Sequence, residues 1–444
     1  NKKRKSPLWM LVPMGVIIVV LSIVLIVITL KSGNQKSEAV SASQVQNKES
    51  ENRGKESVKE NKSGSKDIKD AAGAEPGETD TGPAEIYVSS DIPQKVKDKV
   101  KSMSLEQKAA QLFFVTPEDI TQVDTATVAG EDTKKAYEQY PVGGIVYFSR
   151  NIQGPEQLSG MLAKTQDYAE EIAGVPVFLG VDEEGGEVSR VAGNKNFSVT
   201  EYESMRAIGD SKDTSQAYDV GKNLASYLKE IGFNIDFAPD ADVITNSGNT
   251  VIGDRSFGED PQLTADMAAQ VVRGLQDNGV SACLKHFPGL GGTVEDSHEE
   301  RAYTDKTLEE MEQKEMIPFI EGIKAEPDLI MAGHISIPKS LGDDTPASLS
   351  EKVLTGLLRD KYGYDGLIIT DALDMKAVSG VYSPAEASVK ALQAGADMLL
   401  MPEDFKAAYR GVLDAVRSGD LSQERIDASV ERILRLKMKK YDYP

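Results

Sequence analysis

The feature that most constrains the fold is an alternation of short apolar runs with longer amphipathic stretches, from about residue 90 to residue 444. Runs such as "GGIVYF" and "GLIITDAL" are rich in β-branched and aromatic residues, which is typical of buried strands. The stretches between them, such as "PQLTADMAAQVVRGLQDNG", space their apolar residues as a helix does and end at or near glycine. The eight runs cover residues 109–115, 143–148, 175–182, 233–243, 282–289, 329–335, 366–373 and 397–402.

Eight strands that alternate with helices are the pattern of one fold in particular. We predict an α/β protein whose residues 89–444 form a (β/α)8 TIM barrel. An open, doubly wound parallel sheet is the alternative, because it is built from the same alternating units.

The N-terminal part of the chain has a different character. Residues 8–30, "LWMLVPMGVIIVVLSIVLIVITL", carry no charge over 23 positions, and a helix of this length reaches roughly 35 Å, enough to cross a hydrocarbon core of about 30 Å. Four basic residues lie within residues 1–7, which predicts that this end is cytoplasmic. We expect an uncleaved transmembrane helix in the cell membrane; a cleaved signal peptide is the alternative.

The segment that follows is too polar to fold. Residues 31–85 contain no aromatic side chain, and their only branched aliphatic residues are Val40, Val45, Val58 and Ile68. So little apolar surface cannot offset the entropy lost on ordering the chain. We expect residues 31–88 to be a disordered tether that holds an extracellular barrel domain away from the membrane.

Polar side chains stand at the ends of five of the eight apolar runs. In a TIM barrel the chemistry lies at the carboxyl ends of the strands, so these residues are candidates for a site. The alternative is that these are ordinary loop residues, because strands commonly end in polar side chains. This alternative explains an aspartate at the end of a strand better than it explains Lys285 and His286 directly after "ACL". The residues concerned are Asp182, Asp240, Asp242, Lys285, His286, His334 and Asp371.

The glycine-rich stretch "KHFPGLGGTVEDSH" contains two of the three histidines in the chain. Its glycines predict a pliable loop, able to bring Asp296 and His298 over a pocket and to withdraw them. In "DSH" the carboxylate can accept a hydrogen bond from the imidazole, which fixes its tautomer and raises its pKa. The pair would then act as a general acid and base near neutral pH. The alternative is that Asp296 only caps a turn.

Three other residues are candidates for contact with a ligand or a reacting bond. Asp371 in "LIITDALDM" leaves a buried strand, so it is a candidate nucleophile or electrostatic stabiliser, with a helix N-cap as the alternative. Arg190 in "DEEGGEVSR" shares a glycine-containing loop with Asp182. Arg255 in "GDRSFGEDP" has a planar guanidinium that suits bidentate contact with hydroxyls or a carboxylate. The alternative is that Arg255 is only a salt-bridged loop residue.

Charge and residue spacing argue against two classes of partner. The 50 basic and 71 acidic residues give a net charge of −21, so we expect no nucleic acid partner. A metal hydrolase could draw on His286, His298, His334 and Asp296, but the chain has no HxH or HExxH spacing there. We therefore expect neither a metal nor another cofactor. The single cysteine, Cys283, excludes an intramolecular disulfide.

Together, these stretches resemble family 3 glycoside hydrolases, and in particular their β-N-acetylglucosaminidase branch. The resemblance runs over essentially all of residues 90–444. It is carried by "VGGIVYFSRN", "DEEGGEVSR", "NIDFAPDADV", "VIGDRSFGEDP", "KHFPGLGGTVEDSH", "MAGHI", "PASLS" and "IITDALDM". "KHFPG" followed by "DSH" is the combination that separates this branch from the β-glucosidases of the family.

The resemblance implies a TIM barrel and a retaining mechanism through a covalent glycosyl-enzyme. Asp371 matches the nucleophile, His298 an acid/base on a mobile loop, and Asp296 its partner. The residues that match the grip on the terminal sugar are Asp182, Arg190, Arg255, Lys285 and His286. Two positions depart from the common pattern: Glu187 stands where many members have arginine, and Leu290 where many have histidine.

The expected function is a membrane-anchored, extracellular exo-β-N-acetylglucosaminidase that trims terminal GlcNAc from peptidoglycan fragments or related glycosides. Its expected partners are a carbohydrate substrate and the membrane. One alternative is phosphorolysis, because an imidazole repels an anionic acceptor less than a carboxylate does. Another β-glycosidase activity on the same fold and a non-catalytic wall-binding module are further alternatives.

Overall fold

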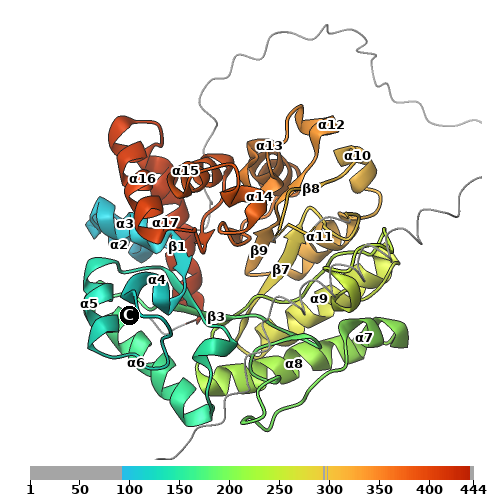
Figure 1. Cartoon of the computed structure of the whole chain (residues 1–444), viewed down its shortest axis with the longest axis horizontal. Helices are drawn as coiled ribbons and strands as arrows, with labels where there is room; N and C mark the ends of the chain where they lie inside the picture. Colours follow the sequence, from blue (N-terminus) through green and yellow to red (C-terminus); the bar gives the residue numbers. More distant parts are fainter. Residues whose placement is uncertain (1–92, 294–295, 298, 441–444) are drawn as a thin grey trace, which may run out of the picture. The chain divides into compact units, whose positions relative to one another are not determined.

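A closed parallel sheet forms the centre of the structure, which is a computed structural model that describes residues 93–293, 296–297 and 299–440. Helices lie around the outside of the sheet (Figure 1). Its eight strands follow the order β11–β9–β7–β6–β3–β2–β1–β12, and every neighbouring pair is parallel. A bridge between Ile369 and Met398 joins the two ends of this order. The predicted (β/α)8 barrel is therefore confirmed over the described residues, in place of an open sheet.

The strands of the barrel are short. They are β1 (Phe113–Val115), β2 (Gly144–Val146), β3 (Phe178–Val181), β6 (Ile235–Asp236), β7 (Ser281–Phe287), β9 (Leu329–Ala332), β11 (Leu367–Thr370) and β12 (Leu399–Leu400). Two small sheets lie outside it: β4 (Glu183–Gly185) pairs antiparallel with β5 (Val188–Ser189), and β8 (Ala302–Tyr303) pairs parallel with β10 (Ile335–Ser336).

Helices begin where the sequence supplies a capping side chain. Ser104, Asp213 and Asp260 each accept a hydrogen bond from a backbone N–H of the first turn, and Gly232 and Gly395 end two helices in the left-handed conformation. The helices of four or more residues before β7 are α2 (Gln94–Ser102), α3 (Leu105–Gln111), α4 (Pro117–Thr121), α5 (Glu131–Gln139), α6 (Pro155–Ala173), α7 (Met205–Ser211), α8 (Thr214–Ile231) and α9 (Pro261–Asp277). Those after it are α10 (Leu308–Met311), α11 (Ile317–Gly322), α12 (Pro338–Leu341), the π-helical segment Leu354–Lys361, α14 (Lys376–Ser379), α15 (Pro384–Ala394), α16 (Phe405–Ser418) and α17 (Gln423–Lys440).

Large aromatic side chains pack among the strands. Phe114 of β1 stacks on Phe178 of β3, with ring centroids 6.5 Å apart, and meets Phe237 edge-on at 5.1 Å. Gly144 and Gly180 lie beside the Phe114 ring, and a Cβ at either position would approach that ring within 2.7 Å. The two glycines therefore make room for the aromatic side chain that fills this part of the barrel.

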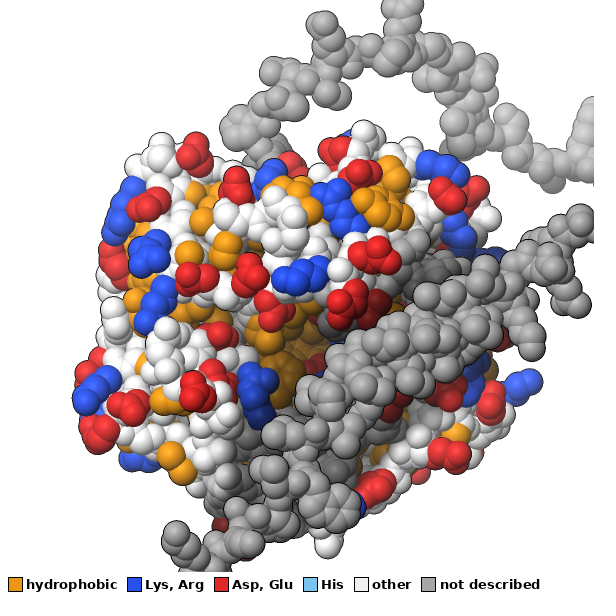
Figure 2. Space-filling model, viewed as in Figure 1, with side chains coloured by type: hydrophobic (Ala, Val, Ile, Leu, Met, Phe, Trp, Pro, Cys, Tyr) orange, Lys and Arg blue, Asp and Glu red, His pale blue; other side chains and the backbone are white. Residues whose placement is uncertain are grey.

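The surface is mixed in charge. Figure 2 shows acidic and basic side chains interspersed over the face in view, with hydrophobic side chains in small groups between them. Among the described residues, the exposed large hydrophobic side chains are Val128, Tyr303 and Val381. Most large apolar side chains are therefore in the core.

Each observed strand is shorter than the corresponding predicted run, and the difference is largest for the run 233–243. The run 233–243 contains only the two-residue strand β6, and Asp240 and Asp242 lie beyond it, because Pro239 has no N–H to donate to a neighbouring strand. Strand β7 contains Lys285 and His286, as the predicted run 282–289 did, and ends at Phe287.

Part of the sequence prediction lies outside the described residues. The expected cytoplasmic segment 1–7, transmembrane helix 8–30 and tether 31–88 all fall there. Within the part of the chain that the structure describes, no helix combines the length and the apolar character needed to cross a bilayer.

One buried carboxylate joins the last helix to the barrel. Asp397, just before β12, is fully buried and accepts hydrogen bonds from Arg359 at 2.5 Å, Arg432 at 3.0 Å and Ser429 at 2.7 Å. It also accepts the backbone N–H of Ile368 at 3.0 Å. Burial raises the pKa of Asp397, but the arginines lower it by more, so the pKa lies below its usual value. The carboxylate thus stays ionised among the cations that surround it.

Asp397→Ala should lower the free energy of unfolding by about 3–5 kcal/mol, because it removes the carboxylate that pairs with the buried Arg359 and Arg432. Asp414→Ala is the matched control: Asp414 is 77% exposed on α16 and forms an ion pair with Arg417. The control should change stability by no more than about 0.5 kcal/mol. Denaturant unfolding of both variants checks this, and equal effects at the two positions would contradict it.

Candidate active site

Five of the predicted site residues meet at one rim of the barrel. Asp182 follows β3, Lys285 and His286 end β7, and Asp371 follows β11. These strands are parallel, so their carboxyl ends lie on the same side of the sheet. Arg255 comes to this rim from the loop between β6 and α9, where it ends a short 3-10 turn, Gly253–Arg255.

A buried carboxylate that the sequence analysis did not single out holds the basic residues together. Glu184, in β4, accepts two hydrogen bonds of 2.8 Å from the guanidinium of Arg255 and lies 2.6 Å from Lys285 Nζ. Lys285 Nζ also donates to Asp182 Oδ1 at 2.9 Å, and Arg255 Nη2 lies 3.2 Å from Asp240 Oδ2. We call Asp182, Glu184, Arg255 and Lys285 the ion cluster.

Mutual attraction keeps the ion cluster charged despite its burial. Burial raises the pKa of Glu184, but Arg255 and Lys285 lower it by more, so this pKa lies well below its usual value. Burial lowers the pKa of Lys285, whereas Asp182 and Glu184 raise it by more, so the ammonium stays protonated. Glu184 and Lys285 therefore stay charged near neutral pH.

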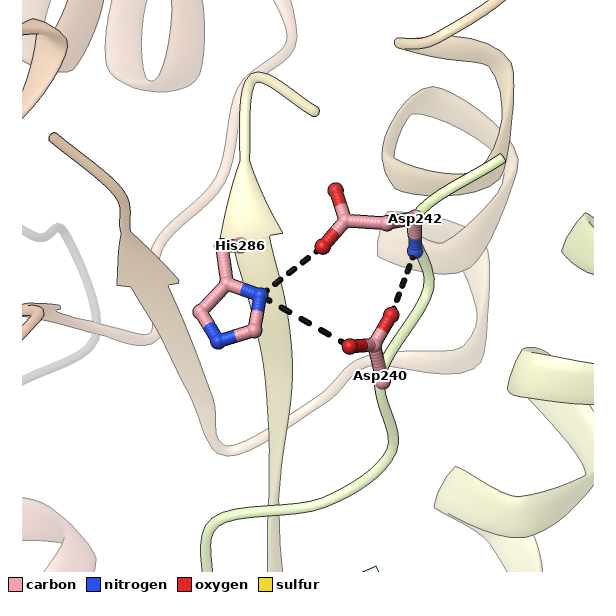
Figure 3. Close-up of side chains that lie close together, drawn as sticks. All are labelled: Asp240, Asp242 and His286. Atoms are coloured by element: carbon pink, nitrogen blue, oxygen red, sulfur yellow. Dashed lines mark hydrogen bonds and ion pairs between the residues drawn. The ribbon is translucent and has the colours of Figure 1, made fainter. Parts of the chain in front are cut away.

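Figure 3 shows a second group of side chains, in which Asp240 and Asp242 face one ring nitrogen of His286. Nδ1 of His286 lies 2.8 Å from Asp242 Oδ2 and 3.8 Å from Asp240 Oδ2, and the backbone N–H of Asp242 donates to Asp240 Oδ1 at 2.9 Å. Because a carboxylate accepts at Nδ1, the other ring nitrogen faces away from both carboxylates. All three side chains are at least nine-tenths buried.

This second group holds a proton near neutral pH. Burial and the neighbouring Asp242 raise the pKa of Asp240 to about 7, while Arg255 and His286 act against the rise. Burial lowers the pKa of His286, but Asp242 raises it by more, so the net shift is upward. One proton thus reduces the repulsion between two carboxylates that cannot both stay ionised at low cost.

The same three residues are the ones that could hold a metal ion among the described residues, because their ligand atoms lie within 4.8 Å of one another. The guanidinium of Arg255 already supplies positive charge to Asp240 at 3.2 Å. Asp242 Oδ1 also accepts the backbone N–H of Leu290, at 2.5 Å. The donor set therefore suits a hydrogen-bonded histidine and carboxylate group better than a cation with a full ligand shell.

Asp371 is fixed through its backbone. Its N–H donates to the carbonyl of Ala332 at 2.8 Å, which extends the pairing of β11 with β9 by one residue. Its Oδ1 accepts the N–H of Ala372 at 2.8 Å. No helix begins within this stretch, because α14 starts at Lys376, so the N-cap alternative for Asp371 is wrong.

Arg190 lies on the β4–β5 side of the rim. Its guanidinium lies 5.9 Å from the centre of the Phe148 ring, and among the described residues it forms no ion pair with the ion cluster. The buried Glu183 holds the segment after β5 in place, because its carboxylate accepts the N–H groups of Val191 and Ala192 at 2.7 and 2.8 Å. Arg190 is therefore not a member of the ion cluster, and its predicted contact with a sugar stays a prediction.

The glycine-rich loop is anchored in its first half. The N–H of Leu290 donates to Asp242, and the carbonyl of Gly291 accepts the N–H groups of Thr245 and Asn246. A Cβ on Gly291 would lie 2.0 Å from the carbonyl oxygen of Val243. Gly291 therefore permits close packing of the loop against Val243, and the predicted pliability of the loop stays a prediction.

The second half of the loop contacts α14, in the segment that follows Asp371. The carbonyl of Ser297, which is buried, accepts the N–H of Ala377 in α14 at 3.2 Å. Asp296 is half-buried, and its carbonyl accepts the N–H groups of Glu299 and Glu300. His298 lies outside the described residues, so the predicted pair of Asp296 and His298 stays a prediction.

Glu184 and the pairing of Asp240 with Asp242 were not predicted as parts of the site. A buried lysine needs a carboxylate partner, and the adjacent "DEE" after β3 was the available indication. Which of those acids would face Lys285 depends on the β4–β5 turn, where Gly185 and Gly186 have φ values of 88° and 70°. That geometry is not readable from residue types alone.

The raised pKa of Asp240 predicts a pH-dependent stability. The folded protein keeps a proton that an unfolded aspartic acid releases near pH 4, so the contribution is present below about pH 4 and is lost as pH rises through about 7. Asp240→Asn should flatten the fall in melting temperature between pH 5 and pH 8. The exposed Asp414→Asn should keep the wild-type slope, and calorimetry over this range decides; identical slopes in all three proteins would refute the assignment.

Comparison with known proteins agrees with the geometry. A family model described as the glycosyl hydrolase family 3 N-terminal domain matches residues 104–436. β-Hexosaminidase A of Pseudoalteromonas piscicida is 33% identical over 334 residues, covering 70% of this chain and 56% of that protein. β-Hexosaminidase LpqI of Mycobacterium tuberculosis is 33% identical over 346 residues, covering 76% of this chain and 83% of that protein.

A solved structure is similar as well. A glycoside hydrolase family 3 β-N-acetylglucosaminidase from Paenibacillus sp. str. FPU-7 has a TM-score of 0.72 and 39% sequence identity, covering 76% of this chain and 63% of that one. The chain spans just over half the length of the Pseudoalteromonas protein and less than two thirds of the Paenibacillus chain. Since the family model covers well over half of its residues, this chain belongs to glycosyl hydrolase family 3.

Proposed function

We propose that this protein is an exo-acting β-N-acetylglucosaminidase that removes terminal, non-reducing β-linked GlcNAc by a retaining mechanism. The observation that carries the proposal is the hydrogen bond from Ala377 to the Ser297 carbonyl. It joins the loop containing Asp296, Ser297 and His298 to the segment that follows Asp371. A glycosidase needs its two catalytic groups on either side of the scissile bond, and this contact brings the two segments together.

In the proposed reaction Asp371 attacks the anomeric carbon, and the bond to the leaving group breaks to give a covalent glycosyl-enzyme. His298 donates a proton to the departing oxygen, then removes one from the water that hydrolyses the intermediate. Asp296 would accept a hydrogen bond from the imidazole and fix its tautomer. The Ala372 N–H donates to one Asp371 oxygen and so orients the carboxylate.

The ion cluster supports the sugar-binding part of the proposal. Lys285 and Arg255 present hydrogen-bond donors, and Asp182 and Glu184 present acceptors, which is the mixture that vicinal hydroxyl groups need. The contacts within the ion cluster hold these groups in place before substrate arrives. His286 adds the ring nitrogen that faces away from Asp240 and Asp242. Such preorganisation reduces the cost of ordering the site on binding.

The proposed setting is the outer side of the cell membrane, with peptidoglycan fragments as substrate. Its support is the uncharged run of 23 residues at positions 8–30, preceded by basic residues and followed by a polar segment. A domain tethered in this way would lie beside the cell wall, whose glycan contains β-linked GlcNAc. The name of the Mycobacterium relative, β-hexosaminidase LpqI, agrees with the sugar class.

Asp371→Ala should lower kcat on p-nitrophenyl β-GlcNAc by at least about 10⁴-fold, because no glycosyl-enzyme forms. His298→Ala should lower it by about 10²–10⁴-fold, with the larger loss on a disaccharide whose leaving group needs protonation. Asp374→Asn, an exposed aspartate three residues after Asp371, is the matched control and should retain activity. Turnover at the wild-type level in the Asp371 variant would exclude the proposal.

Analysis of products on GlcNAc-MurNAc and chitobiose tests the reaction and the leaving-group preference together. We expect NMR to show β-GlcNAc as the first anomer released, since two inversions retain configuration. Added phosphate should give no GlcNAc 1-phosphate. A first-formed α-anomer would contradict the retaining mechanism, and a glycosyl phosphate would establish phosphorolysis instead.

A further inference from the structure

His334 is a buried histidine that the proposed mechanism does not use. It lies between β9 and β10 and is fully buried. Nδ1 of its ring lies 2.7 Å from the hydroxyl of Ser348, and Nε2 lies 2.9 Å from the carbonyl oxygen of Ala372. Ala372 directly follows Asp371, so the ring contacts the backbone of the segment that carries the carboxylate.

These two contacts fix the hydrogen positions on the ring. A carbonyl oxygen only accepts, so Nε2 must carry a hydrogen and donate it to Ala372 in either charge state of the imidazole. The Ser348 hydroxyl can donate to Nδ1, which suits the neutral ring. Ser348 is itself buried, and its N–H donates to the carbonyl of Gly333 at 3.1 Å. The ring is therefore held by the chain on both sides of it.

The contact with Ala372 completes the restraint of one peptide group. The carbonyl of the 372–373 peptide accepts from His334, and its N–H, on Leu373, donates to the carbonyl of Leu400 at 2.9 Å. With both ends bonded, this peptide plane cannot rotate. The preceding peptide then holds its N–H, on Ala372, toward Asp371 Oδ1 at 2.8 Å.

We infer that His334 is a positioning residue for Asp371, which acts through the Ala372 carbonyl without touching substrate. Without this hydrogen bond, the 372–373 peptide can turn about its Leu373 end, and the Ala372 N–H leaves the Asp371 carboxylate. A nucleophile displaced by about 1 Å loses about 10² in rate, whereas sugar binding through the ion cluster is unaffected. The inference rests on the proposed role of Asp371 as nucleophile.

Two substitutions of similar size separate positioning from general support of the fold. Glutamine can place an amide N–H near the position of Nε2 and keep the bond to Ala372, whereas the shorter asparagine reaches only the position of Nδ1 beside Ser348. His334→Asn should lower kcat on p-nitrophenyl β-GlcNAc about 10²-fold with KM unchanged. His334→Gln should keep kcat within about tenfold of the wild type, because one hydrogen bond to the backbone is retained.

Inhibition by free GlcNAc reports on the ion cluster and should be equal in both variants and the wild type. Equal kcat in His334→Asn and His334→Gln, or a raised KM with unchanged kcat, would overturn the inference. Ser348→Ala keeps the histidine but removes the contact between Nδ1 and the Ser348 hydroxyl. This variant should lower kcat by about threefold to tenfold, and a wild-type kcat would also count against the inference. The Asp371→Ala variant is assayed in parallel. If this variant is active, the proposed function itself is refuted. If it is inactive, the His334 variants test the positioning role alone.

Discussion

Closure of the parallel sheet is the constraint on which the rest of the structure depends. An open sheet leaves two strands with unpaired N–H and C=O groups, and a barrel removes both edges. Here the closing contact is made where β11 meets β12. Because all eight strands run the same way, closure also gathers every carboxyl end at one rim. Residues far apart in sequence, such as Asp182 and Lys285, become neighbours there for a reason unrelated to their own chemistry.

Burying so many charged groups at one rim costs free energy, and two different arrangements reduce that cost. In the ion cluster, each buried charge has an opposite charge within hydrogen-bonding distance, and burial then strengthens the attraction. Around His286, two carboxylates share one side of an imidazole, and a retained proton reduces their repulsion. The ion cluster and the titrating Asp240 thus lie next to each other, and the guanidinium of Arg255 contacts both Glu184 and Asp240.

The site also combines residues that are held by the sheet with residues that are carried by loops. Asp371 is held by the sheet through Ala332, and the residues just after it by His334, Leu400 and Met401. The segment with Ser297 reaches the same region through a loop whose first half is anchored by Asp242. Such an arrangement suits a reaction in which a nucleophile stays fixed while a second group approaches from the other side of the bond.

Sequence alone indicated where the strands of the barrel lie and which polar residues stand near their ends, because residue spacing and apolar character are local properties. It therefore identified Asp182, Lys285, His286 and Asp371 as residues of one rim, and the family through their motifs. Only the tertiary structure decided how they pair. Glu184 and Arg255 are 71 positions apart, and His334 reaches Ala372 across 38. The physical reason is that hydrogen bonds and ion pairs act over about 3 Å. Whether two side chains come that close depends on how the sheet closes and how the turns are arranged in space, which cannot be read from the residue types alone.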